Sequence, residues 1–126
     1  MTAPSPIHSA VPVIATDDIQ KSITYYTQIL GFEPDYVYGD PPVFAGVKSG
    51  DVEIYFSYDP DFSQLIRDRK INPEIFIWIT DASFVFQKHV NNGATIVEDI
   101  SDRPWGARQY VLRDINNYHL KFAQPL

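Results

Sequence analysis

The stretch RPWGARQYVLRDINNYHLKFAQ, residues 103–124, decides the fold because it holds a loop, two strands and the turn between them. In the loop, Pro104-Trp105-Gly106 sets a large ring between a stiff residue and a flexible one. The next segment, Ala107 to Arg113, predicts a strand in which neither face is cleanly apolar, as expected where one face packs on the protein and the other lines a wetter surface. Asp114 to Asn117 has the composition of a turn. Tyr118 to Gln124 predicts a second strand, so the stretch as a whole predicts a β-hairpin.

The same order of segments occurs twice along the chain. A helix start at Thr16-Asp17-Asp18 and a helix end at Gly31 are matched roughly sixty positions later by Thr80-Asp81 and Gly93. Each helix follows a short apolar strand and precedes three further strand candidates. The sequence therefore predicts a single α+β domain over 1–126, built from two βαβββ modules at about 7–58 and about 73–126, with a connector at about 59–72. Since neither module can bury its sheet face alone, we expect a curved mixed sheet around a shared trough, or pairing between chains.

The first module gives the clearest local pattern. One helical face is formed by Ile19, Ile23, Tyr26 and Leu30, at spacings of about four, three and four. The strands that we expect around this helix are Ile7–Ala15, Glu33–Tyr38, Val43–Lys48 and Val52–Tyr58. Because Pro12 cannot donate a backbone hydrogen bond, the first of these should lie at an edge or leave its own sheet.

Composition narrows the class of protein. The 126 residues include 44% hydrophobic and 14% aromatic residues and no cysteine, which excludes disulfides and thiolate metal sites. A net charge of −6 argues against nucleic acid as a partner. The same charge could attract a cationic small molecule or simply favour solubility. No apolar run is long enough to span a membrane, and Met1 to Pro6 lacks the features of a secretion signal, so we expect a cytoplasmic protein with no membrane partner.

The loop at Pro104-Trp105-Gly106, the arginine-bearing strand after it and the Arg113-Asp114 turn resemble the end of the bleomycin-resistance proteins. Those proteins belong to the vicinal oxygen chelate superfamily, together with glyoxalase I and extradiol dioxygenases. The likeness extends to Ser9–Val13, Ile29–Phe32, Phe44–Val47 and Asp51–Ser57, and so covers nearly the whole chain. It implies the vicinal oxygen chelate fold and a homodimer that exchanges its first strand between subunits, with binding crevices at the interface.

Enzymes of the resembling superfamily mostly hold a divalent metal with His and Glu side chains from the first, inner and final strands. Near the matching positions this chain has His8, Glu53 and Glu74, but its last strand carries Lys121. An ammonium group repels a metal ion and offers it no lone pair. We therefore expect no metal, no cofactor and no catalytic residue, with His8 and His89 in solvent. A metal-dependent lyase or dioxygenase using His8, Glu53 and Glu74 is the alternative.

The aromatic residues then suggest a binding protein. Flat rings cover much ligand area at low entropic cost and attract cations. The resemblance implies that the chain sequesters a bleomycin-like antibiotic, which is cationic and planar, without making or breaking a bond. A binding module for another small molecule is a further possibility. The ligand residues expected from motif matches and from shared strand faces are Asp35, Tyr36, Phe44, Ser57, Phe76, Trp78, Trp105, Gly106, His119 and Lys121.

Overall fold

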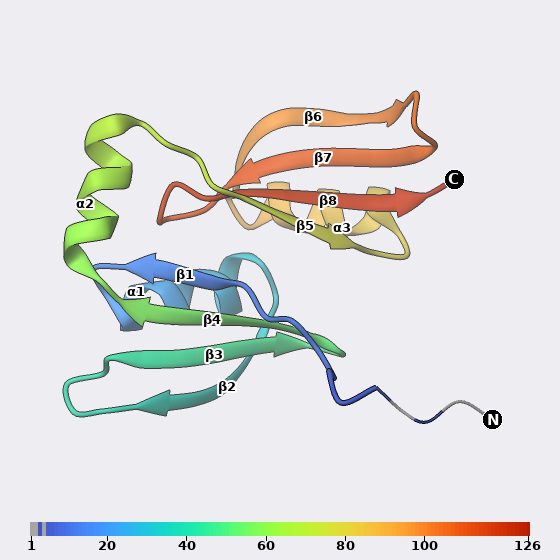
Figure 1. Cartoon of the computed structure of the whole chain (residues 1–126). Coiled ribbons are helices and arrows are strands. Elements are labelled where there is room, and N and C mark those ends of the chain that lie inside the picture. The colour runs from blue at the N-terminus through green and yellow to red at the C-terminus, as the bar shows by residue number, and fades with distance from the viewer. Residues whose placement is uncertain (1–2, 4) are drawn as a thin grey trace.

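The computed structural model describes residues 3 and 5–126, which form two four-stranded mixed sheets with helices against them (Figure 1). The strand orders are β1-β4-β3-β2 and β5-β8-β7-β6. The predicted α+β arrangement of two βαβββ modules is thus confirmed. The elements are β1 (Val13–Thr16), α1 (Ile19–Thr24), the π-helical turn η1 (Tyr25–Ile29), β2 (Glu33–Tyr38), β3 (Phe44–Ser49), β4 (Val52–Tyr58), α2 (Pro60–Arg69), β5 (Glu74–Trp78), α3 (Ala82–Asn91), β6 (Thr95–Arg103), β7 (Ala107–Arg113) and β8 (His119–Pro125).

The first helix has the buried face that its spacing predicts. Asp18 begins it by accepting a hydrogen bond from the Lys21 amide, which satisfies a free donor of the first turn. The last turn widens into η1, and Gly31 ends the helical segment with a φ of +81°. The four predicted core residues, Ile19, Ile23, Tyr26 and Leu30, are at most 8% exposed.

The first strand is shorter than predicted. β1 covers only Val13–Thr16 and pairs in parallel with the end of β4, while Ile7 is 80% exposed. The prediction of a strand from residue 7 is therefore wrong at its start. Pro12 still accepts a hydrogen bond from the Tyr55 amide through its carbonyl, but its ring nitrogen has no hydrogen to continue the ladder.

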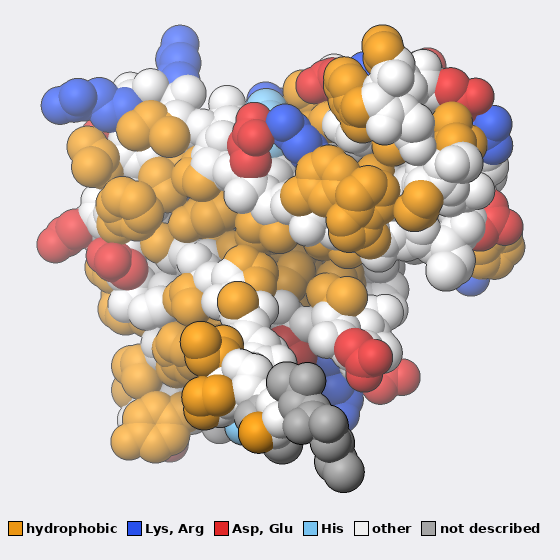
Figure 2. All heavy atoms as spheres, turned by 45° about the vertical axis from the view of Figure 1, so that its right-hand side comes forward, with side chains coloured by type: hydrophobic (Ala, Val, Ile, Leu, Met, Phe, Trp, Pro, Cys, Tyr) orange, Lys and Arg blue, Asp and Glu red, His pale blue; other side chains and the backbone are white. Residues whose placement is uncertain are grey.

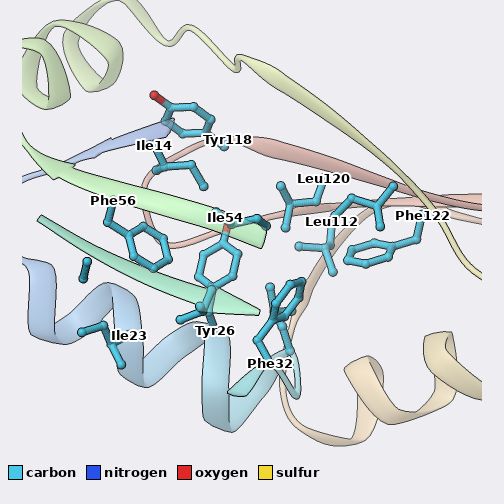
Figure 3. Close-up of a cluster of buried hydrophobic side chains, with 14 of the residues drawn as sticks. Ile14, Ile23, Tyr26, Phe32, Ile54, Phe56, Leu112, Tyr118, Leu120 and Phe122 are labelled. Carbon is cyan, nitrogen blue, oxygen red and sulfur yellow. The ribbon is translucent and has the colours of Figure 1, made fainter. Parts of the chain in front are cut away.

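The core joins the two modules. Figure 3 shows side chains of both sheets, among them Phe56 of β4 and Phe122 of β8, directed into one cluster beside the helices. Polar groups reinforce this contact, since the Ala15 amide donates to the Tyr118 hydroxyl at 3.0 Å. The cluster consists of Ile14, Ile19, Ile23, Tyr26, Leu30, Phe32, Ala45, Val47, Ile54, Phe56, Ile66, Ile77, Tyr110, Leu112, Tyr118, Leu120 and Phe122.

His89 corrects a second expectation. It is only 2% exposed, so the prediction that it lies in solvent is wrong. Its Nε2 lies 3.2 Å from the Leu30 carbonyl and its Nδ1 lies 2.8 Å from the Tyr110 hydroxyl. These partners are satisfied together when Nε2 donates and Nδ1 accepts. The imidazole therefore links α3 to the end of the first helical segment.

The segment between the sheets forms α2, which begins at the N-cap Asp59 and ends at Lys70 with a φ of 53°. Ile66 turns into the core, whereas Phe62 and Leu65 are more than 40% exposed. Among the described helices, none is long and apolar enough to cross a membrane.

Candidate functional site

Alternation along β3 and β4 gives the first sheet an outward face. Ile54 and Phe56 turn into the core, so Glu53, Tyr55 and Ser57 point the other way. The Tyr55 ring lies 5.5 Å from Phe44 and 5.9 Å from Tyr36, centroid to centroid. Desolvation, and then the nearby Glu53 carboxylate, raise the pKa of Tyr55, so its hydroxyl stays protonated at neutral pH.

Gly46 makes room for these rings. A Cβ at this position would lie 2.9 Å from the Tyr36 ring and 3.2 Å from the Tyr55 ring. Any larger residue would therefore push the tyrosines apart. We call Tyr36, Phe44 and Tyr55 the tyrosine cluster.

Two polar members of the predicted set lie near this cluster. Asp35 of β2 has a carboxylate oxygen 3.8 Å from the Lys48 ammonium, both partly exposed. Ser57 lies opposite Phe44 in the ladder between β3 and β4. The first sheet thus holds Asp35, Tyr36, Phe44 and Ser57 together.

On the second sheet, Phe76 and Trp78 of β5 form an edge-to-face pair with ring centroids 4.8 Å apart. Trp78 is 58% exposed and Phe76 is 46% exposed, so neither ring serves as core. Ile77 between them is buried, as the two-residue period of a strand requires. We call Phe76 and Trp78 the aromatic pair.

The loop tryptophan lies just before the first residue of β7. Trp105 is 64% exposed, and its indole N–H donates to the Gln109 side chain at 3.3 Å. Gly106 has a φ of +84°, the left-handed region in which a side chain is disfavoured. The loop therefore holds the indole outside the core.

His119 and Lys121 lie on β8 beside Glu74 of β5. The Lys121 ammonium is 2.9 Å from a Glu74 carboxylate oxygen. The Nε2 atom of His119 is buried with no hydrogen-bond partner among the described residues. Desolvation, and then the Arg113 charge, lower the pKa of His119, so the ring is neutral at pH 7 and can accept or donate one hydrogen bond there.

These residues do not fit a metal ion. Lys121 places a cation within ion-pairing distance of Glu74, one of the carboxylates that a metal would need. His8 is exposed on the segment that precedes β1, and Glu53 accepts a hydrogen bond from Tyr55 at 3.4 Å. In residues 3 and 5–126, no three His, Asp or Glu side chains converge to hold a metal.

A pocket of about 500 Å³ lies along the seam between β4 and β5. In Figure 2 hydrophobic side chains run across the seam between the two halves of the molecule. We call this the seam pocket. It is lined by Ala10, Pro12, Asp51, Val52, Glu53, Ile54, Glu74, Ile75, Phe76, Ile77 and Trp78. Its lining thus combines the aromatic pair with three acidic residues, of which Glu74 is paired with Lys121.

The ten predicted residues therefore fall into separate groups. Four lie on the first sheet, while the aromatic pair, His119 and Lys121 lie on β5 and β8, and Trp105-Gly106 forms the loop before β7. Sequence reasoning did not include Tyr55 or Asp51 in the binding set. The alternation of β4 could have revealed Tyr55, because it shares a face with Ser57. Nothing local indicates Asp51, whose place in the seam pocket depends on how the modules pack.

Comparison with known proteins agrees with this architecture. The bleomycin-binding protein of Streptomyces verticillus, solved with copper(II)-bleomycin, is 26% identical, with 94% of this chain and 97% of that chain covered and a TM-score of 0.74. A glyoxalase-related enzyme of Clostridium phytofermentans is 19% identical, with 97% and 98% covered and a TM-score of 0.77.

A curated relative, an uncharacterized protein of Mycobacterium bovis, is 36% identical over 52 residues, which are 41% of this chain and 34% of the relative. The match thus spans about a third of that relative's length. The family model described as Glyoxalase/Bleomycin resistance protein/Dioxygenase superfamily matches residues 7–122. With nearly its whole length matched, the chain belongs to the glyoxalase/bleomycin resistance protein/dioxygenase superfamily.

Proposed function

We propose that this protein binds and sequesters a cationic, ring-bearing antibiotic of the bleomycin class without changing it chemically. The observation that carries the proposal is the seam pocket, where the aromatic pair stands beside the acidic residues Asp51 and Glu53, while Glu74 is paired with Lys121. Aromatic faces stack on planar heterocycles and attract cations. Carboxylates at the same opening attract and orient a positively charged group.

The ion pair on β8 supports binding over chemistry. Lys121 lies on the last strand, at the position where the superfamily's enzymes place an acidic metal ligand. Its ammonium pairs with the Glu74 carboxylate at 2.9 Å. The similarity to the Streptomyces verticillus protein, at 26% identity over most of both chains, favours a bleomycin-like ligand. With a neutral His119 beside the pair, this face can hydrogen-bond a ligand.

We also propose that the binding unit is a homodimer. The tyrosine cluster and the aromatic pair lie on different sheets, so a second copy would set one face against the other and enclose a larger ligand. Among the described strands, β5 pairs only with β8, which leaves its outer edge free for an extended segment. Ile7, 80% exposed ahead of β1, begins a segment that could reach a partner's edge by strand exchange.

The test is a titration with metal-free bleomycin and with copper(II)-bleomycin, followed by tryptophan fluorescence and by calorimetry. We expect saturable binding with a dissociation constant below about 1 µM, typical of a specific complex. Glu53→Gln should weaken it, whereas Asp61→Asn, an equal charge change at the start of α2, should not. Light scattering should give the mass of two chains. No saturable signal at micromolar drug would sink the proposal.

The alternative is a metal-dependent lyase or dioxygenase with His8, Glu53 and Glu74 as ligands. The similarity to a glyoxalase-related enzyme is the observation that favours it. Elemental analysis separates the two readings. The enzyme requires about one divalent metal per site. The binding protein should purify with substoichiometric metal and bind drug equally well after chelation. A further alternative is a binding protein for a different small molecule. If such a molecule binds at the seam pocket, the proposed site holds and only the proposed ligand is wrong.

A further inference from the structure

A second pocket, on the helical side of the seam, is not used by the proposed function. It has a volume of about 640 Å³, within the usual range of small-molecule sites. We call it the helix-side pocket. Its walls come from the last turns of α3, the end of β5, the turn between β3 and β4, and the segment that closes the first helix.

The floor of this pocket is apolar. Leu30, Phe32, Ile77 and Phe122 belong to the buried core, so their exposed atoms form a rigid, preformed wall. His89 also lines the pocket, but both of its nitrogens bond within the protein. The floor therefore accepts a hydrocarbon or ring and offers it no free polar atom of the imidazole.

The charge around the opening is opposite to that of the seam pocket. Lys88 is the one charged side chain among the described residues that line the helix-side pocket, and no Asp or Glu lines it. The Lys88 ammonium lies 5.1 Å above the Phe84 ring, and it forms no ion pair with a described residue. In a chain of net charge −6, the Lys88 ammonium thus gives the helix-side pocket a local positive charge that favours an anion.

We propose that the helix-side pocket binds a small amphipathic anion, with its apolar body against Leu30, Phe32 and Phe122 and its carboxylate near Lys88. Asn92, at the C-cap of α3, also lines the rim; its side-chain amide gives one hydrogen to the Ile29 carbonyl at 3.1 Å and has a second to donate to the ligand. This site is distinct from the seam pocket, although Val52, Ile77 and Trp78 line both. A ligand in one pocket therefore contacts residues that shape the other.

The test is a titration of ¹⁵N-labelled protein with octanoate, and with 1-octanol as the uncharged match. We expect saturable shifts of the amides of α3 and of the turn at Ser49-Gly50, with octanoate bound more tightly than 1-octanol. Two variants identify the site, because neither residue lines the seam pocket. Val85→Phe fills the pocket and should abolish the shifts. Lys88→Gln should weaken octanoate binding by up to about fivefold, the upper end of the effect of one exposed ion pair, and leave 1-octanol binding unchanged.

Lys21→Gln on α1 is the matched control, since it changes the net charge equally and lies outside this pocket. Thermal melts of each variant show that it is folded. The proposal is overturned by equal binding of octanoate and 1-octanol, by unchanged binding in folded Val85→Phe, or by no saturable shift at about 10 mM, beyond which affinity would be too weak to be specific. Bleomycin binding in Val85→Phe tests the seam pocket separately, so the two proposals can fail independently.

Discussion

The Tyr26 hydroxyl donates a hydrogen bond to the carboxylate of Asp114, and this buried pair ties the first helical segment to the hairpin of the second module. Asp114 also accepts from the amides of Asn116 and Tyr118, each at 2.8 Å. One carboxylate thus holds the β7–β8 turn and fastens it to the other module.

We expect Tyr26→Phe to lower the free energy of unfolding by about 1–3 kcal/mol, because it leaves a buried carboxylate with one partner fewer. Tyr25→Phe is the matched control. The Tyr25 hydroxyl makes only a 3.4 Å bond to the Arg113 carbonyl, in an exposed position, so its loss should cost less than about 0.5 kcal/mol. Urea denaturation measures both. Equal effects of the two changes would contradict a special role for the buried pair.

Asp114 also predicts a pH dependence of stability. Burial, the largest cause, raises its pKa from 3.8 to about 6, against the opposing effect of its hydrogen bonds. Below about pH 4 both states are protonated, and the stabilisation is fully present. As pH rises to about 6 the unfolded chain releases this proton first, so the free energy of unfolding falls by at most about 3 kcal/mol.

His89 acts in the opposite direction, because burial lowers its pKa and protonation on acidification favours the unfolded chain. The Asp114 effect is therefore measured as the difference between the wild type and Asp114→Asn, from urea denaturation between pH 4 and pH 7. We expect the gap between the two curves to change with pH between about 4 and about 6 and to be constant above this window. Parallel curves throughout would show that Asp114 does not titrate there.

Lys121→Glu should turn the β8 face into a cation site. The change removes the ion pair with Glu74 and puts a second carboxylate beside it, near the neutral ring of His119. Two carboxylates and an imidazole can bind Zn²⁺ or Ni²⁺. Calorimetry should detect about one metal per chain in this variant and none in Lys88→Glu, which changes the charge equally at a lysine that forms no ion pair with a described residue. If Lys121→Glu binds no metal, the lysine is not what keeps metal from this site.

Local patterns were enough to predict much of the fold. The first helix, its buried face and the final hairpin can be predicted from the spacing of apolar residues and from turn residues within short stretches of sequence. The module repeat then places the remaining strands. The predicted start of the first strand was wrong because an apolar composition does not supply a partner strand. At residues 7–12 the Pro12 carbonyl is the one backbone group that bonds to a strand of the described chain.

The side chains that join the modules could not be predicted in this way. His89 is buried while Phe84 and Val90 on the same helix are exposed, so the apolar pattern of α3 does not mark its inner face. The partner that decides this is the Leu30 carbonyl, 59 positions away in the sequence. The seam pocket has the same origin, since Asp51 and Trp78 line one pocket only because the two sheets pack together.

Gly46→Ala should disturb the tyrosine cluster without unfolding the protein. A Cβ would meet the Tyr36 ring at 2.9 Å, but that ring is 40% exposed and can move outward. We therefore expect a loss of about 1 kcal/mol in the free energy of unfolding, the low end of the cost of overpacking. In the Tyr36→Leu background the main obstacle is gone, so Gly46→Ala should cost less. If Gly46→Ala lowered the free energy of unfolding equally in both backgrounds, the cause would lie in the β3 backbone or at Tyr55. Gly46 would then not be needed to make room for the Tyr36 ring.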